Sequence, residues 1–286
     1  MMNGNHPLLE VRDLRIDYDI SGAASWRRRT ITVVQGVSFD IAPGETYGLV
    51  GESGSGKSTT GRAILRLADV SGGSVRFDGQ DLTRLPKATP LSYRRDVQAV
   101  YQDPAASLNP RHRVGRAITE TLQRHRIGDR AQRRSKAAEI FKKVGLTEEH
   151  LSRFPGQMSG GQLQRVAIAR ALVLEPRLIV CDEAVSALDL STQSQIINLL
   201  KDLQADTGVS YLFITHDLGV VRHISHRVGV LRRGEIVEQG PTREIFEDPK
   251  DEYTQALLAA SPASHPSGRT ERRAARVRQR IEMGKA

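Results

Sequence analysis

The sequence contains one cysteine, Cys181, among its 286 residues. A single cysteine excludes an intrachain disulfide framework, and such usage is typical of the reducing cytoplasm. No run of ~18 apolar residues is present, so no membrane-spanning helix is predicted. The segment Met1–Leu9 lacks the basic and then apolar layout of a secretory signal peptide. We therefore expect a protein of the cell interior, with Cys181 as an ordinary apolar strand residue.

The chain is basic, with a formal net charge of +9 at pH 7. Such a charge suggests nucleic acid or an anionic membrane surface as a partner. Residues 264–286, however, hold seven Lys or Arg against two Glu, a net of +5 that places more than half of the excess in one tail. A second basic stretch runs from Arg111 to Lys136. Nucleic acid is therefore disfavoured; a solvated surface is the simpler interpretation, and contact with a membrane or partner is the alternative.

A glycine-rich segment from Gly51 to Ser58 follows the pattern G-x-x-x-x-G-K-[ST] of phosphate-binding loops. Consecutive backbone N–H groups in such a loop form a concave anion site, and the following helix adds its positive N-terminal end. Lys57 then brings its charge to the β- and γ-phosphates, and the Ser58 hydroxyl is placed for Mg²⁺. The residues predicted to contact a nucleotide here are Gly51, Ser53, Gly54, Ser55, Gly56, Lys57, Ser58 and Thr59.

The elements around this loop are the ones that it requires. A short strand is predicted for Glu45–Val50, and Thr59–Leu67 has the apolar spacing of a helix. The alternative is a chance Gly/Ser-rich turn, which the order strand, loop, helix disfavours.

Strands and helices alternate along the rest of the chain, which predicts an α/β fold with a mainly parallel sheet covered on both faces. Between Asp103 and Met158 the sequence becomes charged and helical, with a break near Gly128, and this indicates an inserted helical subdomain. The other predicted elements are a strand at Leu8–Ile20, a strand pair at Thr30–Ile41, strands at Gly73–Phe77, Asp96–Tyr101, Arg177–Cys181 and Ser210–Thr215, helices at Leu163–Leu174, Ser191–Asp206 and Leu218–Ser225, and a hairpin at Arg227–Glu238 turning at Arg233 and Gly234.

Two adjacent carboxylates, Asp182 and Glu183, follow the apolar run Leu178–Cys181. The carboxyl ends of parallel strands are where open α/β sheets bind ligands. Asp182 can hold Mg²⁺ near the Ser58 hydroxyl, and Glu183 can accept a proton from an attacking water. Two surface acids at the end of a strand are the alternative.

The segment Ser159–Gln162 begins another helix with a Ser-Gly-Gly sequence. Its backbone N–H groups and the helix dipole favour an anion. A serine that only caps an ordinary helix is the alternative.

Together these residues resemble the ATP-binding-cassette (ABC) ATPases. Ser159–Gln162 matches the signature motif of that family, between the phosphate loop and the Asp-Glu strand end. Gln102 matches the Q-loop glutamine, which is implied to sense the γ-phosphate through Mg²⁺ and water. Ser186–Asp189 matches the D-loop, and His216 matches the switch histidine that touches the γ-phosphate.

The resemblance covers residues 8–260 and implies a role for each matching residue. Tyr18 is the better candidate for the aromatic that stacks on adenine, and Trp26 is the alternative because an Arg-rich loop lengthens the spacing. The implied catalytic residues are Glu183, His216 and Gln102; the implied Mg²⁺ contacts are Ser58, Gln102 and Asp182; and the further nucleotide contacts are Ser159, Gly160, Gly161 and Gln162.

The implied fold is a P-loop NTPase ABC cassette with an antiparallel N-terminal β part, a mainly parallel core and an inserted α-helical subdomain. The expected parts are residues 1–102 and 162–245 for the ATP-binding core, 103–161 for the helical subdomain ending in the signature motif, 246–263 for a C-terminal extension, and 264–286 for a basic tail that is disordered or an isolated helix.

Within the family, the sequence is most similar to the ATP-binding subunits of oligopeptide and dipeptide importers. The stretches Val100–Gly115, Asp182–Asp189 and Asp248–Leu258 carry this similarity. Two departures are Ala184, where a proline usually follows the catalytic glutamate, and Met158, where leucine is common. One cysteine also excludes the C-terminal iron–sulfur cluster of some relatives.

The resemblance implies an ATPase that uses ATP and Mg²⁺ to energise an importer, with oligopeptides or dipeptides as cargo. ATP would lie between the phosphate loop of one chain and the Ser159 segment of an identical or different second cassette. Permease subunits would be direct partners and an extracytoplasmic binding protein an indirect one, with the chain peripheral on the cytoplasmic face of the inner membrane. The alternatives are an ABC subunit for nickel, glutathione, sugars or drugs, and a non-transport ABC ATPase.

Overall fold

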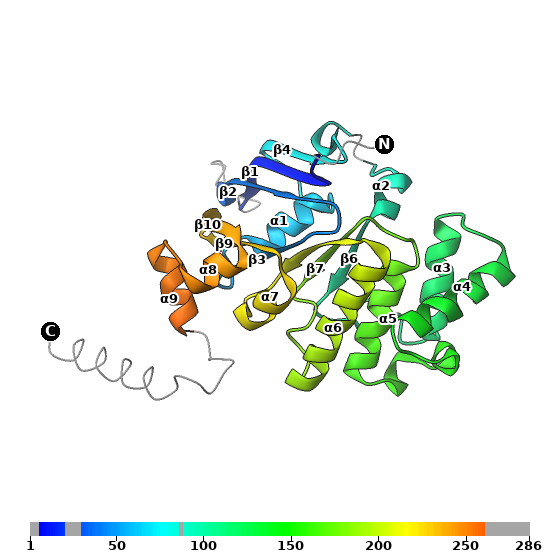
Figure 1. Ribbon diagram of the computed structural model, residues 1–286. Helices are drawn as coiled ribbons and strands as arrows, with labels where there is room; N and C mark the ends of the chain where they lie inside the picture. Colours follow the sequence, from blue (N-terminus) through cyan, green and yellow to red (C-terminus); the bar gives the residue numbers. More distant parts are fainter. Residues whose placement is uncertain (1–5, 21–29, 86–87, 261–286) are drawn as a thin grey trace, which may run out of the picture.

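Two β-sheets form the centre of the computed structural model, which describes residues 6–20, 30–85 and 88–260 (Figure 1). Within these residues, a six-stranded sheet has the order β10-β9-β3-β8-β7-β6, and a four-stranded sheet has the order β2-β1-β4-β5. None of the helices in this part of the chain is long and apolar enough to cross a bilayer.

The larger sheet is parallel except at one edge. The pairs β9–β3, β3–β8, β8–β7 and β7–β6 are parallel, and β10 is antiparallel to β9. Its central strands are almost wholly buried because other elements cover both faces, as is usual for parallel sheets. This confirms the predicted α/β fold. The strands are β3 (Thr46–Val50), β6 (Val97–Tyr101), β7 (Leu178–Asp182), β8 (Ser210–Ile214), β9 (Arg227–Arg232) and β10 (Glu235–Pro241).

The smaller sheet is antiparallel and comprises β1 (Leu9–Asp19), β2 (Thr30–Ile41), β4 (Gly72–Phe77) and β5 (Gln80–Asp81). The prediction of a strand pair at Thr30–Ile41 was wrong, because β2 is one strand that pairs with β1 from end to end. Gly36, with φ +80°, lies at a register shift between the pairs Leu14–Val37 and Arg15–Gln35. A bulge at a glycine bends the strand without ending it.

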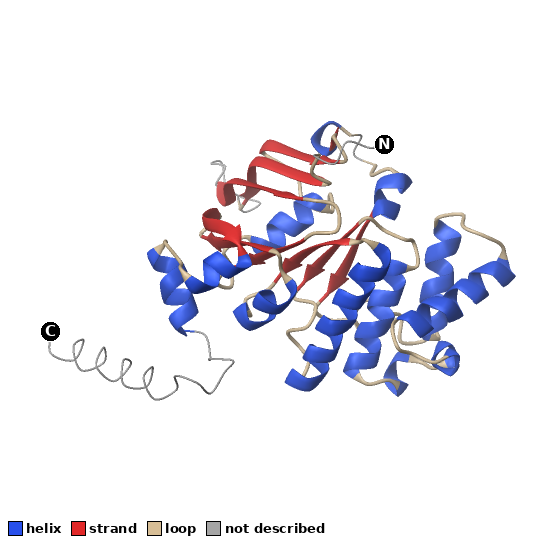
Figure 2. Cartoon of the chain, viewed as in Figure 1, coloured by secondary structure: helices blue, strands red, loops and turns tan. Residues whose placement is uncertain are grey.

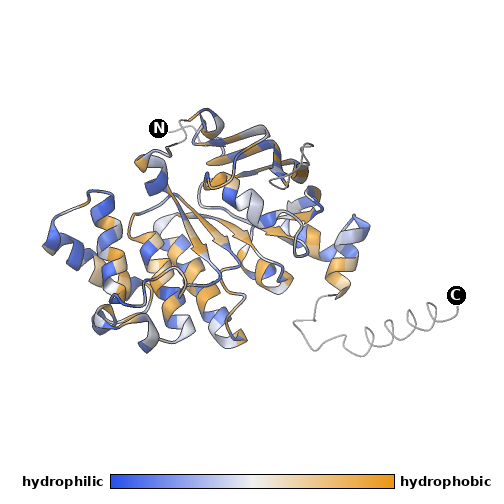
Figure 3. Cartoon of the chain, turned by 180° about the vertical axis from the view of Figure 1, so that it is seen from behind, coloured by the Kyte–Doolittle hydropathy of each residue, from blue (hydrophilic) through white to orange (hydrophobic). Residues whose placement is uncertain are grey.

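Alternate residues of one strand face two different apolar cores. Ile179 and Cys181 pack in a cluster with α5 (Gly160–Leu172) and α6 (Leu190–Thr207). Leu178 and Val180 pack on the other face with the small sheet and with α1 (Lys57–Ile64). The result is a layered molecule in which helices and the small sheet enclose the large one (Figure 2). The central strands are accordingly hydrophobic in Figure 3.

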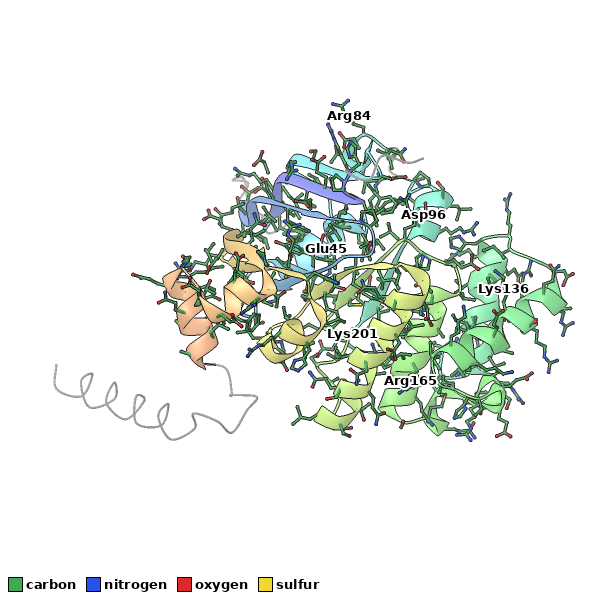
Figure 4. The ribbon with its side chains drawn as sticks, in the orientation of Figure 1. Glu45, Arg84, Asp96, Lys136, Arg165 and Lys201 are labelled. Carbon is green, nitrogen blue, oxygen red and sulfur yellow. The ribbon has the colours of Figure 1, made fainter. Side chains whose placement is uncertain are left out.

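A group of helices lies to one side of the large sheet, as predicted for the stretch between Asp103 and Met158 (Figure 1). It contains α3 (Val114–Arg124) and α4 (Arg130–Lys143), with Gly128 at φ +61° in the break between them. In Figure 4, Lys136 on α4 and Arg165 on α5 are labelled. Arg165 Nη1 donates to the carbonyl of Val144 at 2.6 Å, so α4 ends against α5. These helices share one apolar cluster with the sheet. A division into separate parts at residues 103 and 161 is therefore our proposal.

Several short helices were not predicted, because a helix of about three turns or fewer gives only a weak periodicity. They are the helices α2 (Leu91–Asp96), α8 (Thr242–Glu247) and α9 (Glu252–Ala260), and the 3₁₀ turns Leu82–Arg84, Glu148–Ser152 and Pro155–Gln157. Helix α7 (Leu218–Ile224) was predicted. Trp26 and the basic tail lie outside the described residues.

Candidate nucleotide-binding site

The glycine-rich loop joins β3 to α1 and fits tightly against neighbouring backbone. Gly51 has φ +151°, and a Cβ placed there would lie 2.1 Å from the carbonyl oxygen of Leu231. Gly56 has φ +108°, and a Cβ there would lie 2.8 Å from the carbonyl oxygen of Val33. These two positions therefore require glycine for both conformation and space.

The hairpin turn between β9 and β10 supports this loop through a backbone hydrogen bond. The N–H of Gly234 donates to the carbonyl of Ser55 at 2.8 Å, and the N–H of Gln35 donates to the carbonyl of Gly234 at 2.8 Å. The turn at Arg233 and Gly234 was predicted, but nothing in its sequence indicates that it supports the loop.

Lys57, the first residue of α1, is buried at 5% exposure. Its Nζ donates to the carbonyls of Gly51 and Glu52, each at 2.8 Å. Burial lowers the pKa of the Lys57 ammonium, and the carboxylates of Glu183 and Asp182 oppose this shift. The ammonium group is thus held at the start of the loop, near the two carboxylates that end β7.

Ser58 and Asp182 meet across the gap between α1 and β7. The Ser58 hydroxyl donates to Asp182 Oδ1 at 2.7 Å. Burial raises the pKa of Asp182, and the hydrogen bond from Ser58 acts against that rise. A hydroxyl beside a carboxylate supplies the hard oxygen ligands that Mg²⁺ prefers. Among residues 6–20, 30–85 and 88–260, no cluster of three or more His, Cys, Asp or Glu could hold a metal ion.

Glu183 lies just beyond β7 in a strained backbone conformation. Its φ is +54°, in the left-handed region that side-chain-bearing residues rarely adopt. Its N–H donates to the carbonyl of Ile214 at 2.9 Å, which ties it to the end of β8. Its Oε1 lies 2.9 Å from Nδ1 of His216, whereas Oε2 is buried without a hydrogen-bond partner in the described part of the chain. A buried carboxylate oxygen of this kind calls for a water or a ligand.

One cavity of about 700 Å³ collects most of the predicted site residues. It contains residues of the loop, of the segment after β6, and of the ends of β7 and β8, so it lies at the carboxyl edge of the large sheet. The predicted residues that line it are Gly51, Ser53, Gly54, Gly56, Lys57, Ser58, Thr59, Gln102, Glu183 and His216.

Three lining residues were not predicted as site residues: Val33, Glu52 and Leu257. Glu52 occupies a variable position of the loop pattern, so its presence there was implicit in the motif. Val33 belongs to β2 and Leu257 to α9, and only the tertiary fold brings them to the loop.

The remaining predicted contacts do not line this cavity. Ser55 is a buried residue of the loop, and its hydroxyl has no hydrogen-bond partner among the described residues. Asp182 reaches the site through Ser58. Tyr18 lies on β1 opposite Ile31 and is 40% exposed.

The Ser159 segment begins α5 away from the cavity. The Ser159 hydroxyl accepts from the N–H of Gln162 at 3.3 Å, and Gln162 Oε1 accepts from the N–H of Ser159 at 3.0 Å. This reciprocal pair is a capping box. A Cβ on Gly161 would lie 2.5 Å from Thr192 Cγ2, so the segment packs closely against α6. Ser159 therefore caps its helix, as the alternative interpretation of this segment expected. The segment does not line the cavity of its own chain.

Comparisons with known proteins agree with this geometry. A protein-family model described as ABC transporter matches residues 34–186. The chain is 50% identical over 268 residues, 93% of its length, to the glutathione import ATP-binding protein GsiA of Salmonella typhimurium (strain LT2). It is 51% identical over 262 residues, 91% of its length, to GsiA of Escherichia coli (strain K12). It spans less than half of these relatives, 43% and 42% of their lengths.

Solved structures share the fold. A dimeric post-hydrolysis state of the ATP-binding cassette MJ0796 bound to ADP and Pi has a TM-score of 0.72 at 31% identity, over 82% of this chain and 99% of that one. The structure of cbiO1 from Clostridium perfringens, part of the ABC transporter complex cbiONQ, has a TM-score of 0.73 at 27% identity, over 85% and 91%. With a family match over more than half of its residues, the chain belongs to the ABC transporter family and has the fold of the solved ATP-binding cassettes.

Proposed function

We propose that this chain hydrolyses ATP in the cavity at the carboxyl edge of the large sheet and thereby drives an importer. One observation carries the proposal: the Lys57 ammonium, the Ser58–Asp182 pair and the Glu183–His216 pair converge there from different parts of the sequence. A phosphate-holding, a metal-holding and a proton-accepting group at one site are the parts that phosphoryl transfer requires.

The triphosphate of ATP would lie against the loop Gly51–Ser58. Backbone N–H groups and the N-terminal end of α1 attract its negative charge, and Lys57 adds a full positive charge beside them. Because Lys57 is buried, its interaction with phosphate is less screened by water than that of a surface lysine.

Ser58 and Asp182 are the residues that would hold Mg²⁺, together with Gln102, which also lines the cavity. When bound, Mg²⁺ neutralises charge that develops on the phosphate oxygens.

Glu183 would accept the proton of the attacking water. Its Oε1 lies 2.9 Å from Nδ1 of His216, and Glu183 lines the cavity in which the water would bind. General bases of this kind contribute about 10²–10⁴-fold to a rate. His216 orients the carboxylate and, at 62% side-chain exposure, also reaches the cavity.

A second cassette would complete the site with its Ser159 segment. Two helix starts that favour anions lie on different parts of one chain, and only one of them lines the cavity. A head-to-tail pair of cassettes places the start of α5 from one chain on the phosphates held by the other, and adenine would stack on Tyr18 or Trp26.

Complementation tests this sharing. Lys57→Ala removes the ammonium group of the phosphate loop, and Ser159→Arg, in a separate variant, blocks the signature segment. Each variant alone should lose ATPase activity. In a mixture, the intact loop of one variant meets the intact segment of the other, and activity should return. No recovery would contradict a site shared between identical chains, and the same mixture repeated with a co-purifying second cassette tests the heterodimer.

For the cargo, we propose oligopeptides or dipeptides. This rests on the stretches Val100–Gly115 and Asp248–Leu258, with residues 246–263 as the extension of that importer type. Glutathione is the second candidate, because the GsiA relatives at 50% identity are named for its import and glutathione is a modified tripeptide. Either function makes permease subunits direct partners and places the chain on the cytoplasmic face of the membrane.

Uptake distinguishes the two cargoes. Cells that carry the chain with its neighbouring permease genes would be compared with cells that carry Lys57→Ala, using labelled dipeptides, oligopeptides and glutathione. Lys57-dependent uptake of peptides supports the first candidate, and Lys57-dependent uptake of glutathione alone supports the second. Co-purification with nucleic acid instead of a permease at physiological salt would contradict both.

A further inference from the structure

Helix α9 contacts the phosphate loop through Tyr253. The N–H of Glu52 donates to the Tyr253 hydroxyl at 3.2 Å. One turn further along α9, Leu257 lines the cavity itself.

The peptide unit between Gly51 and Glu52 is held from both sides. Its carbonyl, on Gly51, accepts from Lys57 Nζ at 2.8 Å. Its N–H, on Glu52, donates to Tyr253. The two bonds fix the rotation of this peptide plane, and a glycine at position 51 offers less resistance to rotation than any other residue. The Tyr253 hydroxyl thus acts on the same peptide that positions the Lys57 ammonium.

Helix α9 is held in place by packing against the large sheet and its loops. Tyr253, Leu257 and Leu258 pack against an apolar cluster that includes Val50, the residue just before the loop. The guanidinium of Arg232 lies 4.8 Å from the centre of the Tyr253 ring. A cation at this distance over an aromatic face stabilises the ring position.

The start of α9 is also tied to the sheet. Glu238 on β10 accepts from the N–H of Lys250 at 2.7 Å through Oε1 and from the N–H of Asp251 at 3.2 Å through Oε2. Asp251 in turn accepts from the N–H groups of Tyr253 and Thr254, at 2.9 and 3.3 Å. A chain of hydrogen bonds therefore runs from β10 to the tyrosine.

We infer that Tyr253 is a positioning residue of the nucleotide site, which holds the Gly51–Glu52 peptide in the orientation that places Lys57 for the phosphates, and that α9 is part of this site. The inference rests on the proposed binding of ATP at the loop. Without the hydroxyl, the peptide N–H turns to water and the loop samples other orientations. Apparent affinity for ATP then falls in proportion to the fraction of loops that remain competent.

The test is Tyr253→Phe, which removes the hydroxyl and keeps the ring on Arg232. The Kd for ATP and the kcat and KM for hydrolysis would be measured on the full chain. Loss of one hydrogen bond should raise Kd and KM about fivefold and leave kcat within about twofold, because Glu183 and His216 are untouched. Tyr211→Phe is the matched control: its hydroxyl donates to the carbonyl of Leu200 at 3.1 Å away from the loop, so Tm should fall and Kd should stay.

Two further variants separate the possible outcomes. Glu238→Ala removes the hydrogen bonds that hold the start of α9, and Glu238 does not line the cavity, so the change should raise the Kd for ATP as Tyr253→Phe does. An unchanged Kd would contradict the role of α9 in positioning the loop. If Lys57→Ala binds ATP like the wild type, the proposed function itself fails. If Lys57→Ala loses binding while Tyr253→Phe keeps wild-type affinity, the inference alone is overturned.

Discussion

The substitution Gly51→Ala tests how tightly the phosphate loop is built into the fold. A Cβ at this position would lie 2.1 Å from the Leu231 carbonyl oxygen and 2.9 Å from Ser55 Oγ. The nearer atom belongs to the backbone of β9, which cannot move away without disturbing the sheet. Overpacking of this kind costs about 1–3 kcal/mol. The φ of +151° adds about 1–3 kcal/mol, because that region is nearly restricted to glycine.

Gly54→Ala is the matched control within the same loop. Gly54 has φ +81°, but no atom lies within 4 Å of a Cβ placed there. Only the conformational cost remains, about 1–2 kcal/mol. The free energy of unfolding, measured by urea titration of both variants, should therefore fall by about 2–6 kcal/mol for Gly51→Ala and by about 1–2 kcal/mol for Gly54→Ala.

Gly51→Ala should also lose ATP affinity, because the altered residue carries the carbonyl that accepts from Lys57. Equal losses of stability in the two variants would refute the argument from close packing. A folded Gly51→Ala protein with wild-type ATP affinity would refute the link between the Gly51 peptide and Lys57.

Three further predictions concern the metal, the core and pH. Removal of Mg²⁺ with EDTA should abolish hydrolysis, and Ser58→Ala should raise the Mg²⁺ concentration needed for half-maximal activity, because one oxygen ligand beside Asp182 is lost; an unchanged Mg²⁺ titration would contradict this site. Phe141→Ala, in the fully buried core of α4, should lower the free energy of unfolding by about 3–5 kcal/mol in chemical denaturation. The hydrogen bond from Arg177 holds the pKa of Asp78 below its ordinary value. The stabilisation that this pair contributes is therefore fully present above the unfolded pKa of about 4 and is lost as pH falls through the folded pKa. The Tm difference between wild type and Asp78→Asn should shrink as pH falls over that range.

The phosphate loop and the parallel strands were predictable because their signals are local. Gly51–Ser58 carries its pattern in eight consecutive residues, and Leu178–Cys181 is uniformly apolar because both of its faces are buried. The convergence of Ser58 with Asp182 also followed, since the carboxyl ends of parallel strands lie along one edge of the sheet.

Other features depend on contacts between distant segments, and no local pattern reports them. The continuity of β2 through Gly36 depends on pairing with β1, which accommodates a bulge. Support of the loop by Gly234 and by Tyr253 needs the β9–β10 hairpin and α9 to fold back on it. For the Ser159 segment, one sequence fits both a capping box and a phosphate contact, and the single chain displays only the first.

The most direct test of the proposed mechanism is the ATPase rate of Glu183→Gln. Glutamine keeps the shape of the side chain but cannot accept a proton from water. We predict ATP binding with wild-type affinity, turnover reduced by about 10²–10⁴-fold, and a stable dimer in the presence of ATP and Mg²⁺. Turnover close to that of the wild type would contradict the role of Glu183 as the general base and, with it, the proposed chemistry of this site.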